Sequence, residues 1–307
     1  MSAETEMDRR LQAAQAGLLA QHAPDTHIRR VRWSRGHTQV LEAGDGPPVL
    51  LIHGGLDNAF VWVPILQTLA RSRHVLAVDL PGHGLADPFD YSGEDLLDLA
   101  RTFLRDILDG LELPSVDLVG CSVGGLWSVV FAIDDPDRVS RLAIVGAPPG
   151  VTRSVPNQLR LLGLPLIGRP LGRLLMSNPT REGNRKFLGQ VAVVHPENLT
   201  DEQLDADVAS QRRNIGSHLS LMSCLIGPGG VRRRLILGER WQSLSVPTLF
   251  LLGERDAFVP PKMEKAWEAI IARNPNIRMV RIPGAGHLAW LDAPEHVVRE
   301  IERFLAA

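Results

Sequence analysis

A Gly-Cys-Ser-Val-Gly segment at 120–124 constrains the fold of this chain more than any other feature. It follows directly on the mostly apolar run 116–119 and precedes a helix-like stretch over 125–133. A serine between a strand and a helix sits on a strained bend, and only small neighbours let the two elements close around it. The segment therefore predicts a sharp strand-to-helix turn that carries the exposed hydroxyl of Ser122, the geometry of a nucleophile elbow.

Apolar runs alternate with helical patterns through most of the chain. Runs rich in Val, Ile and Leu predict strands over 28–33, 39–42, 49–52, 75–78, 116–119, 142–145, 248–252 and 277–282. Apolar residues at helical spacing predict helices over 96–108, 125–133, 262–271 and 295–305. Strands of this kind that alternate with helices build a mostly parallel sheet covered on both faces. We therefore expect an α/β fold.

The alternation stops between 151 and 245, a stretch too long to be a loop in a compact domain. Within it, Thr200 and Gln203 form a capping-box pattern that predicts the start of a helix. We expect residues 151–245 to form an inserted helical cap on a core made of residues 25–150 and 246–307. The remaining residues, 1–24, carry apolar residues at helical spacing and predict an amphipathic N-terminal helix that packs on the domain or on a partner subunit.

Charge and cysteine content exclude several classes of protein. The formal net charge of -2 gives no drive toward nucleic acid, which is not expected as a partner. The two cysteines, Cys121 and Cys224, cannot build a disulfide framework, so a reducing, cytoplasmic setting is expected. The first ten residues are polar and do not form a secretory signal, and no apolar run reaches the roughly 18 residues of a membrane span. Stable membrane insertion is therefore not expected, and a homodimer is left open.

Two glycines and a histidine follow the expected strand 49–52. From this position the backbone N–H of Gly55 can reach an oxyanion formed at Ser122, and the N–H of Val123 would be the second donor. His53 opens the same turn, and we interpret it as a side chain that braces the loop.

Two further candidates follow the last two expected strands. Asp256 ends a Gly-Glu-Arg-Asp segment after 248–252, which places its carboxylate at the carboxyl edge of the sheet. Glu254 competes with it, but lies closer to the strand and is interpreted as structural or solvated. His287 lies in a glycine-rich loop after 277–282, and such a loop can carry an imidazole to the same edge.

From about residue 30 to residue 305, the chain resembles the α/β-hydrolase family. The matching segments are His-Gly-Gly at 53–55, Asp-Leu-Pro-Gly-His-Gly at 79–84, the turn at Ser122, Gly-Glu-Arg-Asp at 253–256 and Gly-His at 286–287. The resemblance implies an α/β-hydrolase fold with a mostly parallel central sheet, helices on both faces and an inserted helical cap. A serine at the elbow is unlike the haloalkane dehalogenase and epoxide hydrolase branches, which carry an aspartate there.

The resemblance and the order Ser, Asp, His imply a serine hydrolase. Ser122 would be the nucleophile, His287 the base, and Asp256 the residue that orients His287. Gly55 and Val123 would hold the oxyanion, and no metal or organic cofactor is required.

The substrate class is less constrained than the reaction. Apolar residues of the expected cap, among them Leu174 and Met176, favour a carboxylic ester of small to medium size with a hydrophobic part. A second reading is carbon–carbon hydrolysis of a vinylogous diketone, in which Arg212 or Arg213 would bind a substrate carboxylate. A third is a ligand-binding protein on the same fold that does not turn over its ligand.

Overall fold

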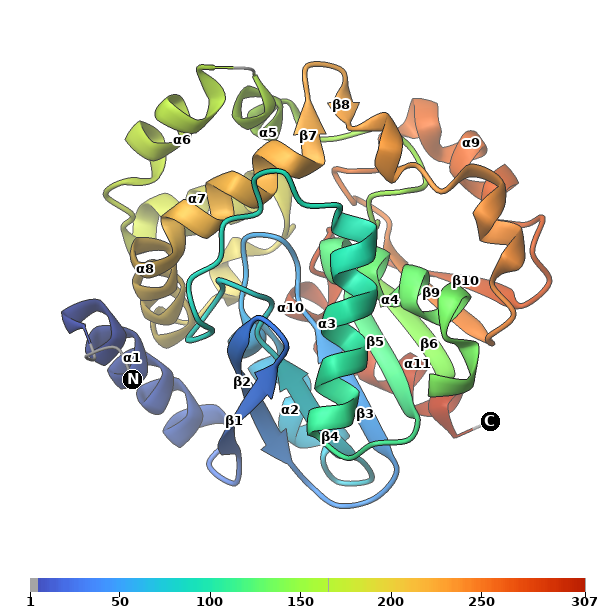
Figure 1. Ribbon diagram of the computed structural model, residues 1–307, viewed down its shortest axis with the longest axis horizontal. Helices are drawn as coiled ribbons and strands as arrows, with labels where there is room; N and C mark the ends of the chain where they lie inside the picture. The colour runs from blue at the N-terminus through green and yellow to red at the C-terminus, as the bar shows by residue number, and fades with distance from the viewer. Residues whose placement is uncertain (1–4, 165, 307) are drawn as a thin grey trace.

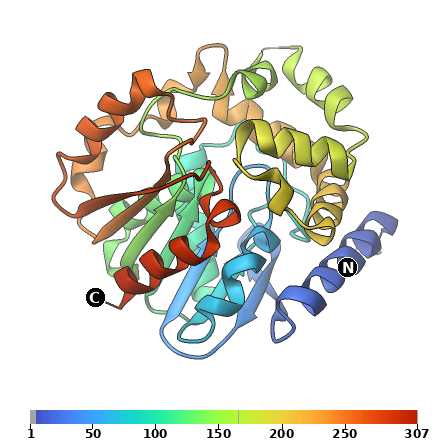
Figure 2. The same ribbon diagram turned by 180° about the vertical axis from the view of Figure 1, so that it is seen from behind.

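A computed structural model describes residues 5–164 and 166–306 of the chain. Its centre is a sheet whose strands lie in the order β1-β2-β4-β3-β5-β6-β9-β10 (Figures 1 and 2). The strands are β1 His27–Trp33, β2 Gly36–Ala43, β3 Pro48–Ile52, β4 His74–Val78, β5 Val116–Cys121, β6 Val139–Val145, β9 Thr248–Gly253 and β10 Ile277–Ile282. The pairs β1–β2 and β2–β4 are antiparallel, and every other pairing in this sheet is parallel.

Helices cover both faces of the sheet. One face carries α3, α4 and α9, and the other carries α2 and α11 (Figures 1 and 2). The helices outside the 151–245 stretch are α1 Glu6–His22, α2 Val63–Leu69, α3 Leu96–Gly110, α4 Ser122–Asp134, α9 Pro261–Ile271, α10 Ala289–Asp292 and α11 Pro294–Leu305. Short 3-10 turns, η1 Ala59–Trp62 and η2 Pro136–Arg138, complete this part of the chain.

The apolar runs of the sequence are buried on both sides, as their composition predicted. In β3, Leu50 and Ile52 pack into the core under α3 and α4, whereas Val49 and Leu51 pack under α2 and α11. Each expected strand is present, and β10 has the bounds that were predicted. β6 begins three residues before the predicted run because Val139 pairs with β5 while the polar Ser140 and Arg141 face outward at the strand start.

All elements of the 151–245 stretch but its last 3-10 turn, which lies beside α9, lie over the carboxyl ends of the strands (Figure 1). The elements of this stretch are α5 Asn157–Arg160, η3 Leu161–Gly163, α6 Gly168–Met176, α7 Arg181–Val191, η4 Pro196–Asn198, α8 Asp201–Leu225, β7 Ile226–Gly227, β8 Gly230–Val231, η5 Arg233–Leu235 and η6 Gly238–Ser243. The capping box predicted at Thr200 is present, since its side chain accepts from Gln203 N and Gln203 bonds back to the Thr200 N–H. It starts the long helix α8.

The N-terminal helix is also present, and it begins with a second capping box between Thr5 and Asp8. Its buried side chains are Leu11, Gln15, Leu18 and Leu19. In both views α1 lies alongside the lower end of α8 (Figures 1 and 2). None of the helices in the described ranges is both long enough and apolar enough to cross a membrane.

The strand order reverses beside β3. The chain passes from β3 to β4 on one side and then returns to place β5 on the other side of β3. Ligands of open α/β sheets bind at the carboxyl ends of the strands, where the order reverses. Ile52 of β3 is paired with Gly120 of β5, so the turns that carry Gly55 and Ser122 leave the sheet side by side.

Candidate active site

Ser122 stands on the predicted turn, between the end of β5 at Cys121 and the start of α4. Its φ of 50° lies in the left-handed region, which a residue with a side chain adopts only when its surroundings impose it. The two glycines of the motif, Gly120 and Gly124, explain how the surroundings impose this φ on Ser122. A Cβ on Gly124 would lie 2.3 Å from the carbonyl oxygen of Ile52, and one on Gly120 would lie 2.6 Å from Ser128 Oγ. Only glycine therefore lets β3, β5 and α4 approach so closely at this point.

The structure brings His287 and Asp256 together from the loops after β10 and β9. The Nδ1 of His287 lies 3.0 Å from both carboxylate oxygens of Asp256, and both side chains are buried. The same carboxylate accepts from the backbone N–H of Ala147 at 2.8 Å and of Phe258 at 2.9 Å. Burial opposes ionisation of Asp256, but His287 and the backbone donors outweigh it and hold the pKa of this carboxyl below its usual value.

Glu254 does not reach this pair. Its carboxylate accepts from the backbone N–H of Gly284 at 3.2 Å, in an exposed position. Between the two acids that the sequence offered, the geometry therefore selects Asp256 as the partner of His287.

The other nitrogen of His287 is left available. Because Nδ1 faces the Asp256 carboxylate, Nδ1 carries the hydrogen and Nε2 presents a lone pair. This Nε2 is buried and has no hydrogen-bond partner among residues 5–164 and 166–306. Phe258 stacks on the imidazole with ring centroids 4.1 Å apart, which fixes the plane of the ring. No pattern in the sequence indicated this role of Phe258.

Ser122 and His287 line the same pocket, which lies between the sheet edge and the 151–245 stretch. Its cavity volume is about 100 Å³, so the pocket is narrow. Most of its wall is apolar, and the elements of the 151–245 stretch contribute Val155, Leu159, Phe187, Leu188, Val191, Met222, Leu225, Ile226 and Val231. No Lys or Arg lines it within the described parts of the chain.

Gly55 and Val123, the two expected oxyanion donors, both line this pocket. A Cβ on Gly55 would lie 2.8 Å from the Met222 methyl and 2.9 Å from Val123 Cγ2. The Gly55 backbone is therefore packed directly against the residue that follows Ser122. A larger residue at 55 would displace the turn from the serine.

Two buried histidines brace the Gly54-Gly55 turn. His53 donates from Nδ1 to the Gly54 carbonyl at 2.7 Å and accepts at Nε2 from the Leu80 N–H at 2.9 Å, so its neutral Nδ1–H form fits both contacts. His83 places Nε2 3.1 Å from the Gly55 carbonyl and Nδ1 2.9 Å from that of Pro81. Burial lowers the pKa of both rings. The sequence predicted the brace at His53 but not the one at His83.

A third buried histidine, His218, lies behind this brace. Its ring centroid is 4.7 Å from that of His83, and both of its nitrogens are buried without a hydrogen-bond partner in the described residues. It does not line the pocket beside Ser122.

Replacing His83 by Ala is expected to lower kcat by about tenfold to a hundredfold with little change in KM, because a displaced Gly55 N–H would stabilise the oxyanion less well. Steady-state kinetics on a short ester would measure this. His218→Ala is the matched control. It removes a neighbouring imidazole that is equally buried but makes no contact to Gly55. Equal losses of kcat in the two variants would show that His83 contributes only to packing.

The two apolar candidates of the cap, Leu174 and Met176, lie away from the pocket. Leu174 is 73% exposed on the outer side of α6. Met176 lines a separate surface hollow between α1, α6 and α8. Their apolar character favoured a pocket wall but could not show which side of α6 faces the sheet. The pocket is lined instead by side chains of α5, α7 and α8.

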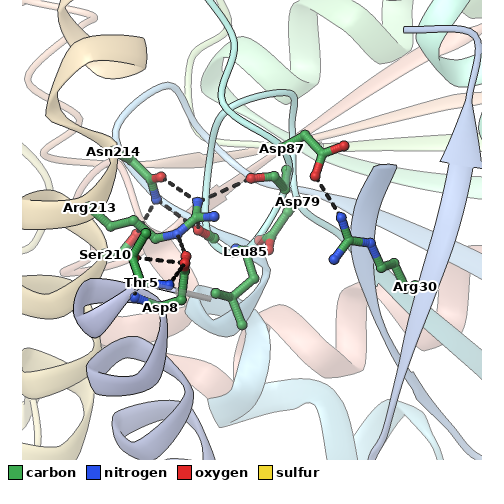
Figure 3. Close-up of polar contacts among 11 residues, drawn as sticks. Thr5, Asp8, Arg30, Asp79, Leu85, Asp87, Ser210, Arg213 and Asn214 are labelled. Atoms are coloured by element: carbon green, nitrogen blue, oxygen red, sulfur yellow. Dashed lines mark hydrogen bonds and ion pairs between the residues drawn. The ribbon is translucent and has the colours of Figure 1, made fainter. Parts of the chain in front are cut away.

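Both arginine candidates are engaged in structural contacts, and Figure 3 shows those of Arg213. Arg213 bonds from Nε to Asp8 at 2.5 Å, and from Nη1 to the carbonyls of Gly84 at 2.8 Å and Ala86 at 3.1 Å. It thus joins α8 to α1 and to the loop after β4. Arg212 bonds to the Pro179 carbonyl at 3.2 Å and faces the same hollow as Met176.

The sequence missed a carboxylate on the pocket wall. Asp57 follows the glycine turn, lines the pocket and is half-buried by the surrounding chain. This burial raises the pKa of Asp57 to about 6, against the attraction of His287. Asp207, on α8, is near enough that the charge of Asp57 adds to burial in raising its pKa to about 7. Only the adjoining glycines in the sequence pointed to this position.

No cluster of three or more His, Cys, Asp or Glu side chains suited to a metal ion occurs in the described ranges.

Comparison with known proteins supports hydrolase activity. The chain is 27% identical to the pimeloyl-[acyl-carrier protein] methyl ester esterase of Xanthomonas campestris over 88% of this chain and 99% of that protein. It is 27% identical to the 2-hydroxy-6-oxononadienedioate/2-hydroxy-6-oxononatrienedioate hydrolase of Cupriavidus pinatubonensis over 84% of this chain and 86% of that protein. The crystal structure of the carboxylesterase CesB (YbfK) from Bacillus subtilis matches with a TM-score of 0.78 at 21% identity, covering 98% of this chain and 99% of that one.

A family model also matches, and it covers residues 49–301, which include Ser122, Asp256 and His287. Together with the sheet topology, it confirms the fold class expected from the sequence. The chain belongs to the alpha/beta hydrolase family.

Proposed function

We propose that the protein is a serine hydrolase that cleaves a carboxylic ester of a small to medium hydrophobic substrate through an acyl-enzyme. The observation that carries the proposal is the buried Asp256–His287 pair, whose free Nε2 belongs to the same apolar pocket as the strained Ser122. A serine hydroxyl is a weak nucleophile that needs an adjacent base. The pair supplies that base.

In the first half of the reaction, Ser122 Oγ attacks the ester carbonyl carbon while its proton passes to Nε2 of His287. The carbonyl oxygen becomes an oxyanion that the N–H groups of Gly55 and Val123 stabilise. Asp256 keeps the ring in the Nδ1–H form and stabilises the imidazolium. The bond to the alcohol then breaks, and the imidazolium gives its proton to the leaving oxygen.

In the second half, water replaces the alcohol. Nε2 of His287 takes a proton from the water as its oxygen attacks the acyl carbon, and the second oxyanion uses the same two donors. The bond to Ser122 Oγ breaks, the imidazolium returns its proton to Oγ, and the carboxylic acid leaves. Every step uses groups of this chain and water.

The chemistry of the wall favours a neutral ester over a substrate that carries its own acid. The wall is apolar apart from a few polar side chains, and Asp57 is its acidic member next to the glycine turn. A substrate carboxylate would need a cation, yet Arg212 and Arg213 are engaged elsewhere. The two esterases among the relatives fit this reading, whereas the Cupriavidus relative keeps carbon–carbon hydrolysis as the second candidate.

A panel of substrates tests the proposal. Neutral esters of increasing acyl length, a thioester, a lactone and an acidic dienone would be compared by kcat/KM. We expect turnover of neutral esters and at most weak turnover of the dienone. Cleavage of the dienone with no turnover of any neutral ester would establish the carbon–carbon reaction instead. Saturable binding of these compounds without turnover of any of them would indicate a ligand-binding protein.

Asp57→Asn is expected to relax discrimination against anionic substrates. A neutral butyrate ester and a hemiglutarate ester of the same alcohol differ by one terminal carboxylate, which an ionised Asp57 repels. Removing this charge should narrow the ratio of their kcat/KM values by about tenfold, roughly 1.4 kcal/mol. Because both esters react through Ser122 and His287, an effect of the substitution on these two residues cancels in the ratio of the two kcat/KM values.

The pH dependence has a definite sign. Because the pKa of Asp57 is about 6, the ratio in the parent protein should be large at pH values well above 6 and should shrink as the pH falls through 6. In Asp57→Asn, this ratio should not change with pH over the same range. Asp25→Asn, at an exposed position in the turn after α1, is the control. A parent ratio that does not change with pH would mean that Asp57 does not face the substrate.

A further inference from the structure

Large apolar side chains are unusually exposed on one short segment. Seven large hydrophobic residues are exposed in the described part of the chain, and five of them lie between 161 and 175. These five, here called the outer patch, are exposed by 45% to 96%: Leu161, Leu166, Ile167, Leu174 and Leu175. Single exposed apolar residues are normal, but a group of this kind marks a surface that contacts something other than water.

The way α6 packs explains why its leucines face outward. Gly172 is the residue that meets α8, since a Cβ there would lie 2.5 Å from Leu219 Cδ2 and 2.8 Å from Leu162 Cδ2. The helix therefore docks through its small residues, and Leu174 and Leu175 remain outside. In both views α6 lies on the outer rim of the molecule, away from the sheet (Figures 1 and 2).

The charged residues of the segment that carries the outer patch are all of one sign. Residues 157–176 contain Arg160, Arg169 and Arg173 and no Asp or Glu. All three arginines are exposed. Arg169 bonds to Ser92 Oγ at 3.0 Å and forms an ion pair with Asp90 at 4.0 Å, whereas the side chains of Arg160 and Arg173 have no hydrogen bond or ion pair within the described residues. This local positive charge stands on a chain whose net charge is -2.

Apolar residues combined with arginines match the surface of an anionic lipid layer. The leucines can enter the boundary between headgroups and acyl chains, and the arginines can contact the phosphates. A second copy of the chain fits less well, because a two-fold contact through the same patch would bring like-charged arginines together. Charge complementarity therefore selects the lipid layer.

The same segment also forms part of the pocket wall. Leu159 lines the pocket beside Ser122, and Leu162 is buried, whereas Leu161 between them is exposed. At Leu161, a side chain of the outer patch therefore lies two positions along the chain from one that lines the pocket. A lipid layer that covers the outer patch would lie next to the pocket.

We propose that the outer patch, with Arg160 and Arg173, docks the protein onto the surface of an anionic lipid layer, without crossing it, next to the pocket that holds Ser122. Docking itself does not depend on turnover. That the ester substrate comes from this layer rests on the proposed function.

Flotation with vesicles tests docking on full-length Ser122→Ala protein, so that the result does not depend on hydrolysis. The probes are vesicles of phosphatidylcholine alone and of phosphatidylcholine with phosphatidylglycerol. We expect binding to the second kind only, with affinity that falls as salt rises. Ile167→Ser with Leu175→Ser should weaken binding by about tenfold or more, and so should Arg160→Gln with Arg173→Gln.

Matched controls carry the same changes elsewhere on the surface. Ile28→Ser, on β1, removes an equally exposed isoleucine, and Arg71→Gln removes an exposed arginine. Both should bind vesicles as the parent does. In an otherwise unchanged chain, the patch variants should keep parental turnover of a short soluble ester, which shows that they fold and separates this proposal from the proposed function.

Three results would overturn the proposal. One is a parent protein that does not bind the anionic vesicles, and another is patch variants that bind as well as the controls. The third is a parent that light scattering shows to be a dimer and that Ile167→Ser with Leu175→Ser converts to a monomer, which would assign the patch to a second copy.

Discussion

Ser122→Ala is expected to lower kcat for a neutral ester by at least about three orders of magnitude, the scale seen when the nucleophile of a triad is removed. The variant loses the oxygen that forms the acyl-enzyme. The oxyanion donors and the pocket remain and would account for any residual rate. Alanine has the same Cβ as serine at this positive φ, so the strain at the turn and the fold should be preserved.

The measurement combines turnover, thermal unfolding and labelling by a serine-reactive fluorophosphonate. The parent should be labelled at residue 122, and the variant should not be labelled. Ser154→Ala is the control, because Ser154 lines the same pocket without lying on the elbow, and its kcat should stay within about threefold of the parent. Near-parental turnover by folded Ser122→Ala protein would show that another residue is the nucleophile.

The sheet and the candidate site could be predicted from the sequence because their signals are local. The buried strands consist of continuous apolar runs, and the turn at Ser122 needs glycines that no other residue can replace. Asp256 and His287 could be placed because each follows such a strand at the carboxyl edge of the sheet. Because the strands are parallel, the loops that follow them lie at the same edge of the sheet, whatever the sequence between the strands.

The contacts that could not be predicted join distant parts of the chain. Arg213 meets Asp8, which is 205 positions away, and nothing near either residue in the sequence indicates the other. A helical arginine among polar residues has the same pattern whether it binds a substrate, a carbonyl or water. The contact forms because α1 and α8 lie side by side in the fold.

Orientation is the second limit, and α6 illustrates it. Its leucines and glycines are both spaced so that either could form the buried side of a helix. The apolar pattern alone would bury Leu174, but Gly172 allows a closer approach to α8 and turns the leucines outward. Asp57 is similar, because its burial depends on the elements above it and not on its neighbours in the sequence. Packing between elements decides both cases.

Asp256→Asn is expected to lower kcat by about four orders of magnitude, as when the aspartate of a triad is replaced by its amide. The side chain keeps its shape and can still accept from the N–H of Ala147 or Phe258 through its oxygen. Its NH2 group, however, would face Nδ1 of His287 and favour the ring form with the hydrogen on Nε2. That form cannot take the proton of Ser122, and the lost carboxylate no longer stabilises the imidazolium.

Glu254→Gln is the control for Asp256→Asn, because it makes the same chemical change two residues earlier in an acid that bonds to Gly284 and not to His287. Its kcat should stay within about twofold of the parent. Thermal unfolding should show that both variants fold. A severe loss in Glu254→Gln together with normal turnover in Asp256→Asn would reverse the assignment of the acid. A loss confined to Asp256→Asn would tie turnover to the one carboxylate that contacts the imidazole, since the two acids share a loop and differ in the partner they hold.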